Sequence, residues 1–133
     1  MDVLKPNRDW LLGRLKHSLE ILAAPADIQL RTVPSFGHRA GQLYMSFNHW
    51  RSRVVGYCPC EIGVGQRALL DSMERTFTDM SQECWTDNGV SSSPEWEHVR
   101  LLSSKTLQSF GWLLQDSPNS IMTGTGSLLR TTF

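Results

Sequence analysis

The stretch of sequence that decides the fold is residues 93–112, which read Ser-Pro-Glu-Trp-Glu-His-Val-Arg-Leu-Leu-Ser-Ser-Lys-Thr-Leu-Gln-Ser-Phe-Gly-Trp. Ser93 belongs to the residue types that cap helix N-termini, and Pro94 fits the first helical position. Gly111 suits the left-handed conformation that ends many helices. Between them a stripe recurs at spacings of three and four, widened by Leu102: Trp96, Val99, Ser103, Leu107 and Phe110. Because Trp and Phe need apolar cover, we expect the chain to pack around this helix.

The rest of the chain also favours helices. Apolar residues at helical spacing predict helices over residues 9–24, 40–55 and 64–81, and Asp9 is the predicted cap of the first. Residues 26–33 fit a short helix, although they also alternate like a strand. Residues 56–65 are predicted to be a connection, and residues 34–37 and Asp87-Asn88-Gly89 to be turns.

These elements predict an all-α fold. We expect a compact bundle of four to five helices in residues 1–112, with neighbours packed antiparallel, and an irregular tail over residues 113–133. Roughly one tryptophan falls in each predicted element, and these five side chains should dominate the buried area: Trp10, Trp50, Trp85, Trp96 and Trp112.

Composition limits the class of protein. A chain of 133 residues suffices for one domain, and 40% hydrophobic residues is a globular composition. No apolar run approaches the roughly 20 residues that cross a bilayer, and the N-terminus lacks the order of a secretory signal. Three cysteines, an odd number, favour a reducing compartment. We therefore expect a cytoplasmic protein with no membrane partner.

The net charge is zero, but its distribution is uneven. Residues 1–67 hold nine basic and five acidic side chains, whereas residues 68–133 hold four basic and eight acidic ones. Two candidate surfaces for a protein partner follow from this segregation. One is Trp50, Arg51 and Arg53, residue types that are common at binding hot spots, and the other is Glu83, Trp85 and Asp87. Zero net charge disfavours general nucleic-acid binding.

Metal and catalytic chemistry have little sequence support. Cys58, Cys60 and Cys84, with His49 or His98, are suitable zinc ligand types, but their spacing does not match a zinc knuckle. None of the four histidines lies in a known catalytic signature, and Gly63-Val-Gly65 lacks the phosphate-loop fingerprint. We therefore predict no catalytic residue, no metal and no cofactor.

Several segments resemble a group of small bacterial helical proteins without assigned function. They are Leu-Glu-Ile-Leu-Ala-Ala-Pro-Ala-Asp-Ile-Gln-Leu at 19–30, Cys-Trp-Thr at 84–86, Ser-Pro-Glu-Trp-Glu-His-Val-Arg-Leu-Leu at 93–102 and Phe-Gly-Trp at 110–112. In that group the final helix reads Pro-Glu-Trp-x-x-Val-Arg and ends in Leu-Gly-Trp. The resemblance covers most of residues 10–112, departs from the group at residues 42–50, and implies a helical fold but no catalytic residues.

Three functional hypotheses remain open. The first is a small intracellular protein-binding domain, in its most specific form a bacterial immunity-type inhibitor of a toxin partner. The second is a structural or self-associating helical protein, in which tail residues Leu128, Leu129 and Phe133 complete a homo-oligomer. The third is a small-ligand or metal-binding protein, or an enzyme, with a pocket near Cys58, Cys84 and His49.

Overall fold

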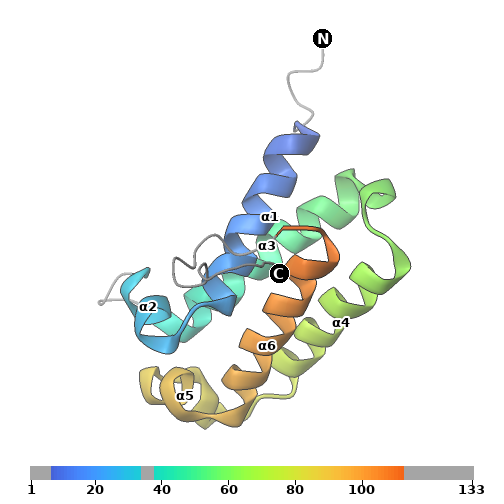
Figure 1. Cartoon of the computed structure of the whole chain (residues 1–133). Coiled ribbons are helices and arrows are strands. Elements are labelled where there is room, and N and C mark those ends of the chain that lie inside the picture. The colour runs from blue at the N-terminus through green and yellow to red at the C-terminus, as the bar shows by residue number, and fades with distance from the viewer. Residues whose placement is uncertain (1–6, 34–37, 113–133) are drawn as a thin grey trace, which may run out of the picture.

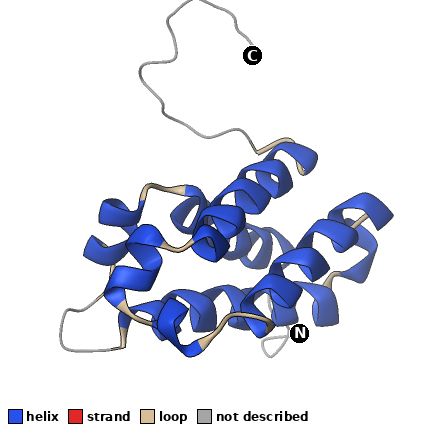
Figure 2. Ribbon diagram, turned by 90° about the horizontal axis from the view of Figure 1, so that it is seen from below, coloured by secondary structure: helices blue, strands red, loops and turns tan. Residues whose placement is uncertain are grey.

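The computed structural model describes residues 7–33 and 38–112, and this part of the chain is all-α (Figures 1 and 2). Four long helices and two short ones follow one another, with 3₁₀ turns at Pro59–Glu61 and Gln82–Trp85 and no strand in the described ranges. The helices are α1 (Arg8–Ala23), α2 (Ala26–Arg31), α3 (Arg39–Tyr57), α4 (Val64–Thr78), α5 (Asp87–Ser92) and α6 (Pro94–Ser109). The predicted fold class is confirmed, whereas the tail at 113–133 and the turn at 34–37 lie outside the described residues.

The four long helices form a bundle in which each neighbour runs antiparallel to the next (Figure 1). Helix α6 packs extensively against both α1 and α4, and α1 packs against α3. Helices α3 and α4 meet over a smaller area, and α2 and α5 pack together at one end of the bundle. The predicted antiparallel packing is therefore observed, and α6 is covered by two long neighbours.

Helix α6 forms as its sequence predicts. The Ser93 hydroxyl accepts a hydrogen bond of 3.2 Å from the backbone N–H of Trp96, and Pro94 occupies the first turn. At the other end Gly111 has φ of 77°, the left-handed conformation that a C-terminal glycine provides. Trp96 is fully buried, and its indole N–H donates to the backbone carbonyl of Cys84 at 2.8 Å.

Only one of the five tryptophans lies fully inside the core, so the predicted dominance of tryptophan in the buried area is wrong. Trp96 is 0% exposed, whereas Trp10 is 54% exposed and Trp50 and Trp85 are partly buried. Most of the core consists of aliphatic side chains from the four long helices, with two phenylalanines: Leu11, Leu15, Leu19, Leu22, Phe47, Val54, Leu70, Met73, Phe77, Val99 and Leu107. Helical spacing identifies a face, but a neighbouring element must cover that face to bury it.

Several helix boundaries in the structure differ from the predicted ones. Asn7 caps α1 in place of Asp9, because its side-chain oxygen accepts from the backbone N–H of Trp10 at 3.0 Å. Helix α3 begins at Arg39 behind the His38 cap and continues to Tyr57, two residues past its predicted end. Residues 26–31 are helical, which decides between the helix and strand alternatives for that segment.

The predicted turn at Asp87-Asn88-Gly89 is wrong, because these residues form the first half of α5. The Thr86 hydroxyl accepts from the backbone N–H of Gly89 at 2.9 Å and so caps the helix. A Cβ at Gly89 would lie 2.4 Å from the carbonyl oxygen of Glu83 and 2.5 Å from that of Cys84. Glycine at this position therefore lets α5 lie directly on the preceding 3₁₀ turn.

A buried polar network closes the end of the bundle near α2. Gln29 is fully buried, and its amide nitrogen donates to the carbonyls of Ile21 and Leu22 at 3.2 and 3.0 Å. Its amide oxygen accepts from Arg100 at 2.8 Å, and Arg100 also donates to the carbonyl of Val90 at 3.1 Å. The network satisfies carbonyls at the end of α1 and links α1, α2, α5 and α6.

Candidate functional surface

The strongest candidate site is an exposed cluster centred on Trp50, where α1 and α3 pack together. The Trp10 ring meets Trp50 edge to face with centroids 5.3 Å apart, and the His49 ring does the same at 4.5 Å. The guanidinium carbon of Arg14 lies 4.9 Å from the centre of the Trp50 ring, which is cation–π geometry. Trp50 is thus surrounded by groups from both helices, while Trp10 remains 54% exposed.

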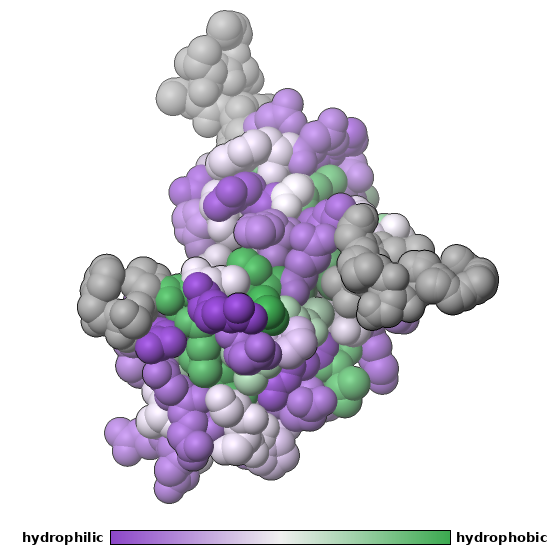
Figure 3. All heavy atoms as spheres, turned by 60° about the vertical axis from the view of Figure 1, so that its left-hand side comes forward, coloured by the Kyte–Doolittle hydropathy of each residue, from purple (hydrophilic) through white to green (hydrophobic). Residues whose placement is uncertain are grey.

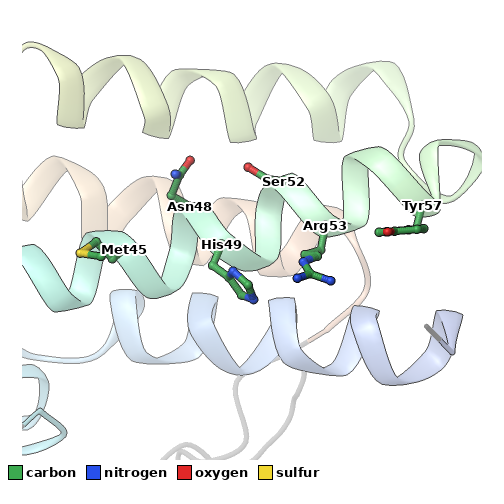
Figure 4. Close-up of a pocket in the computed structure, with 6 residues that line it drawn as sticks. All are labelled: Met45, Asn48, His49, Ser52, Arg53 and Tyr57. Carbon is green, nitrogen blue, oxygen red and sulfur yellow. The ribbon is translucent and has the colours of Figure 1, made fainter. Parts of the chain in front are cut away.

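The same side of α3 carries an open depression of about 520 Å³, lined by Met45, Asn48, His49, Ser52, Arg53 and Tyr57. Figure 4 shows His49 and Arg53 extending toward α1, whereas Asn48 and Ser52 extend toward α4. Met45 and Tyr57 are 65% and 55% exposed. We call the combined surface the aromatic–basic surface and define it by Trp10, Arg14, His49, Trp50, Arg53 and Tyr57.

This surface has positive charge without neutralisation from the described residues. Helix α3 contains three arginines and no acidic residue over its 19 residues. Two of those arginines pair within the molecule, Arg39 with Asp87 at 3.5 Å and Arg51 with Glu74 at 3.6 Å. For Arg53 and Arg14, residues 7–33 and 38–112 supply no carboxylate within 4 Å.

Arg51 lies on another face of α3 from Trp50 and Arg53. Its guanidinium donates to the side-chain oxygen of Asn48 at 2.7 Å and lies 3.6 Å from the carboxylate of Glu74. The hydroxyl of Tyr44 donates to the same carboxylate at 2.9 Å. Burial, with help from the nearby Glu74 carboxylate, raises the pKa of Tyr44 above its usual 10.0. Arg51 therefore joins α3 to α4 inside the molecule, and its side chain is mostly buried.

The acidic candidate surface, Glu83, Trp85 and Asp87, is likewise divided between the exterior and the interior of the molecule. Glu83 is exposed and accepts from the Ser81 hydroxyl at 3.0 Å, and Asp87 is exposed in the first turn of α5. Trp85 instead faces the interior, where its ring packs edge to face on Trp96 with centroids 6.1 Å apart. Because Asp87 also pairs with Arg39, only part of this set offers free charge at the surface.

The three residues of the hypothetical pocket do not come together. Cys58 ends α3 before α4 begins, and Cys84 follows the end of α4, so the length of that helix, about 22 Å at 1.5 Å per residue, separates them. His49 is exposed on the aromatic–basic surface. Burial raises the pKa of the Cys58 thiol above its usual 9.0, which favours the unreactive protonated form at neutral pH. The described residues contain no group of three side chains suited to holding a metal.

A second depression, of about 470 Å³, lies where the α1–α2 corner meets α6. Its lining includes Ala23, Pro25, Leu101 and Arg100, but the Arg100 guanidinium is already engaged by Gln29 and Val90. Viewed with the α2 side forward, the molecule shows apolar side chains gathered near the middle of the face and hydrophilic ones around them (Figure 3). Leu101 is 55% exposed. This depression therefore offers a ligand apolar contact and no uncommitted charge from Arg100.

Two of the six residues that define the aromatic–basic surface are among the partner contacts that the sequence predicts. Trp50 and Arg53 were identified from their local motif, but Trp10 and Arg14 on α1 were not. A usable signal existed, since Trp10 and Arg14 are four residues apart and lie off the leucine stripe of α1. Their meeting with Trp50 depends on how α1 packs against α3, which the local sequence does not contain.

Comparisons of the chain with protein-family models, curated proteins and solved structures give no match. The resemblance of residues 10–112 to a group of small bacterial helical proteins therefore stays a prediction. None of the helices in residues 7–33 and 38–112 combines the length and the apolar character that a bilayer-spanning segment requires.

Proposed function

We propose that this protein is a protein-binding domain that engages its partner through the aromatic–basic surface. The observation that carries the proposal is the Trp50 cluster, in which Trp10 and Arg14 of α1 and His49 of α3 surround one ring at the molecular surface. Tryptophan, tyrosine and arginine are the residue types that most often dominate the energy of protein interfaces.

A partner that covers this surface would gain free energy from the burial of apolar area. Trp10, Tyr57 and Met45 each expose more than half of their surface, so covering them removes apolar area from water. The rings of Trp10 and Trp50 are already held by an edge-to-face contact and a cation–π contact, which reduces the entropy lost when a partner orders them. A preorganised aromatic surface flanked by arginines is therefore suited to protein recognition.

The specific form of the proposal is an immunity-type inhibitor, which acts by covering a toxin partner. Segregated charge supports this form, because complementary charge accelerates association and excludes other partners. Such a protein needs a rigid contact surface and no reactive group of its own. The partner would be encoded beside it, since an inhibitor must be present whenever its toxin is made.

The test is co-purification of the full chain with the product of the adjacent gene, together with rescue of cells from that product. Wild type should form the complex and protect cells. Trp10→Ala should weaken both, because it removes exposed aromatic area at the proposed contact. The matched control is Leu101→Ala on α6, since Leu101 is 55% exposed and lies outside the aromatic–basic surface.

Two results would reject the proposal. One is the absence of any complex and of any rescue with wild type. The other is a complex that Leu101→Ala weakens as much as Trp10→Ala does, because contact would then not depend on the aromatic–basic surface.

A further inference from the structure

We infer that the aromatic–basic surface takes an acidic segment of a partner protein, whose carboxylates pair with Arg14 and Arg53 while an apolar side chain covers Trp10. The inference rests on the proposed function, because it names the chemical class of partner for the same surface. It is carried by the guanidinium groups on this surface and by the positions of the nearby carboxylates.

Four carboxylates on α1, on α4 and in the 3₁₀ turn after α3 are already engaged elsewhere. Asp9 and Glu61 both pair with Arg8, at 3.2 and 3.0 Å. Glu20 lies 4.0 Å from Lys16, and Glu74 contacts Arg51 on the side facing α4. The residues that the structure describes thus leave the guanidiniums of Arg14 and Arg53 without an anionic partner, although they neutralise the other two arginines of α3.

The geometry of Arg14 favours a carboxylate in particular. Its guanidinium lies over the face of Trp50, with the guanidinium carbon 4.9 Å from the ring centre. A stacked guanidinium keeps its edge N–H groups available, and those groups match the two oxygens of a carboxylate. Arg53 extends toward α1 and lines the depression together with Tyr57 (Figure 4). Arg14 and Trp10 lie on α1 against Trp50, whose ring also meets His49 of that depression.

Two features favour an acidic protein segment over a nucleic acid. A nucleic-acid surface commonly neutralises many phosphates, so it needs a row of cations, whereas this surface offers two guanidiniums. The chain as a whole also has zero net charge. Met45, Trp10 and Tyr57 add apolar area that a peptide with both carboxylates and aliphatic side chains can cover.

The experiment measures binding of fluorescein-labelled peptides to the full-length protein by fluorescence anisotropy. Three peptides of equal length share the same leucines and differ only in carrying glutamate, glutamine or lysine at the remaining positions. We expect the glutamate peptide to bind about tenfold more tightly than the glutamine peptide and the lysine peptide to bind least. Raising the salt concentration from about 50 to about 300 mM should lower the affinity for the glutamate peptide most, because salt screens exposed charges.

Variants test whether the peptides bind at the aromatic–basic surface. Arg53→Glu should lower the affinity for the glutamate peptide about tenfold and should raise the affinity for the lysine peptide, since it reverses one charge at the contact. Arg53 is exposed at the outer side of α3, so the variant should keep its far-ultraviolet circular dichroism spectrum. Lys105→Glu on α6 makes the same charge change away from the surface and should leave all three affinities unchanged.

Four outcomes of the binding experiments would overturn the inference, and a fifth would come from sedimentation. They are equal binding of the glutamate and glutamine peptides, no binding of any peptide, glutamate-peptide binding that Arg53→Glu leaves unchanged, and tighter binding of an oligothymidylate of similar length. Salt-sensitive self-association that Arg53→Glu abolishes in sedimentation would also overturn it, because a second copy would then occupy the surface. The proposed function fails separately, when the adjacent-gene complex is absent or does not depend on Trp10.

Discussion

Two tryptophan clusters in this molecule consist of similar residues and have opposite surroundings. In the first, Trp96 on α6 is fully buried against Phe77 and Trp85, with centroids 5.4 and 6.1 Å away. In the second, Trp50 on α3 packs against Trp10 and Arg14 of α1 and remains partly exposed. The interior cluster is completed by a hydrogen bond to a backbone carbonyl, and the surface cluster is bordered by cations.

The difference follows from the position of each helix in the bundle. Helix α6 packs against α1 and α4 and is also contacted by α5, so its aromatic stripe is enclosed. The outer side of α3 has no described helix over it, and its exposed residues include Met45 and Tyr57. An identical side chain therefore stabilises the fold in one place and is available for binding in the other.

The largest expected effect is that of Trp96→Ala. This substitution removes the largest fully buried side chain and leaves the Cys84 carbonyl without its 2.8 Å donor. We expect a loss of about 3–5 kcal/mol in the free energy of unfolding, measured by urea denaturation followed by circular dichroism. A loss below about 1 kcal/mol would show that α6 does not organise the core as described.

Gly89→Ala is expected to have the next largest effect, because the interior cluster depends on α5 lying close to the 3₁₀ turn. The new Cβ would meet backbone oxygens of Glu83 and Cys84, which cannot move independently. We expect a loss of about 1–3 kcal/mol in the same urea experiment. The control is Gly13→Ala in α1, where nothing lies within 4 Å and alanine should stabilise the helix by about 0.5–1 kcal/mol. Equal effects at the two glycines would contradict the close approach of α5.

Trp10→Ala tests the surface cluster and should have a small effect on stability. The substitution removes an edge-to-face contact at 5.3 Å, but the side chain is already 54% exposed. We expect a loss of about 1 kcal/mol or less in the free energy of unfolding. Loss of partner binding without loss of stability would sharpen the contrast with Trp96. A stability loss near that of Trp96→Ala would remove the contrast.

The smallest expected effect is a decrease in stability at alkaline pH. The pKa values of Cys58 and Tyr44 are raised in the folded state, so folding favours the protonated thiol and phenol. Their contributions are fully present below pH 9 and pH 10, respectively, and are lost as the pH rises through the higher folded-state values. Urea denaturation between about pH 8 and about pH 11 should show this decrease.

Conservative variants test whether Cys58 and Tyr44 cause the decrease in stability at alkaline pH. Cys58→Ala should flatten the pH dependence above pH 9, and Tyr44→Phe should flatten it above pH 10. If both variants kept the wild-type slope, the decrease would arise from other groups and the burial of these two would not explain it.

Much of the helix pattern was predictable because its signals are local. Ser93, Pro94 and Gly111 mark the limits of α6, and the stripe that includes Trp96 and Val99 identifies its buried side. Each signal depends only on residues a few positions apart, since capping bonds and helical faces are defined by the backbone of one segment. For the same reason Trp50 and Arg53 could be proposed as surface candidates from their local motif.

Other features depend on contacts between separate elements, whether these are near or far apart in the sequence. Gly89 is helical because the Thr86 cap and the adjacent 3₁₀ turn fix it there, whereas the isolated Asp-Asn-Gly sequence is typical of a turn. Arg51 is directed inward by Glu74 on α4, while Arg53, two residues later, remains at the surface.

The helical character of the chain, the two ends of α6 and the apolar side of α6 all follow from the local sequence. Which tryptophans are buried in the core and which lie at the surface depends on how the helices pack, and so does the contact of Trp10 and Arg14 with Trp50. The physical reason is that helical periodicity is a property of one segment, whereas burial and charge pairing require a second segment, whose approach depends on the packing of the whole bundle.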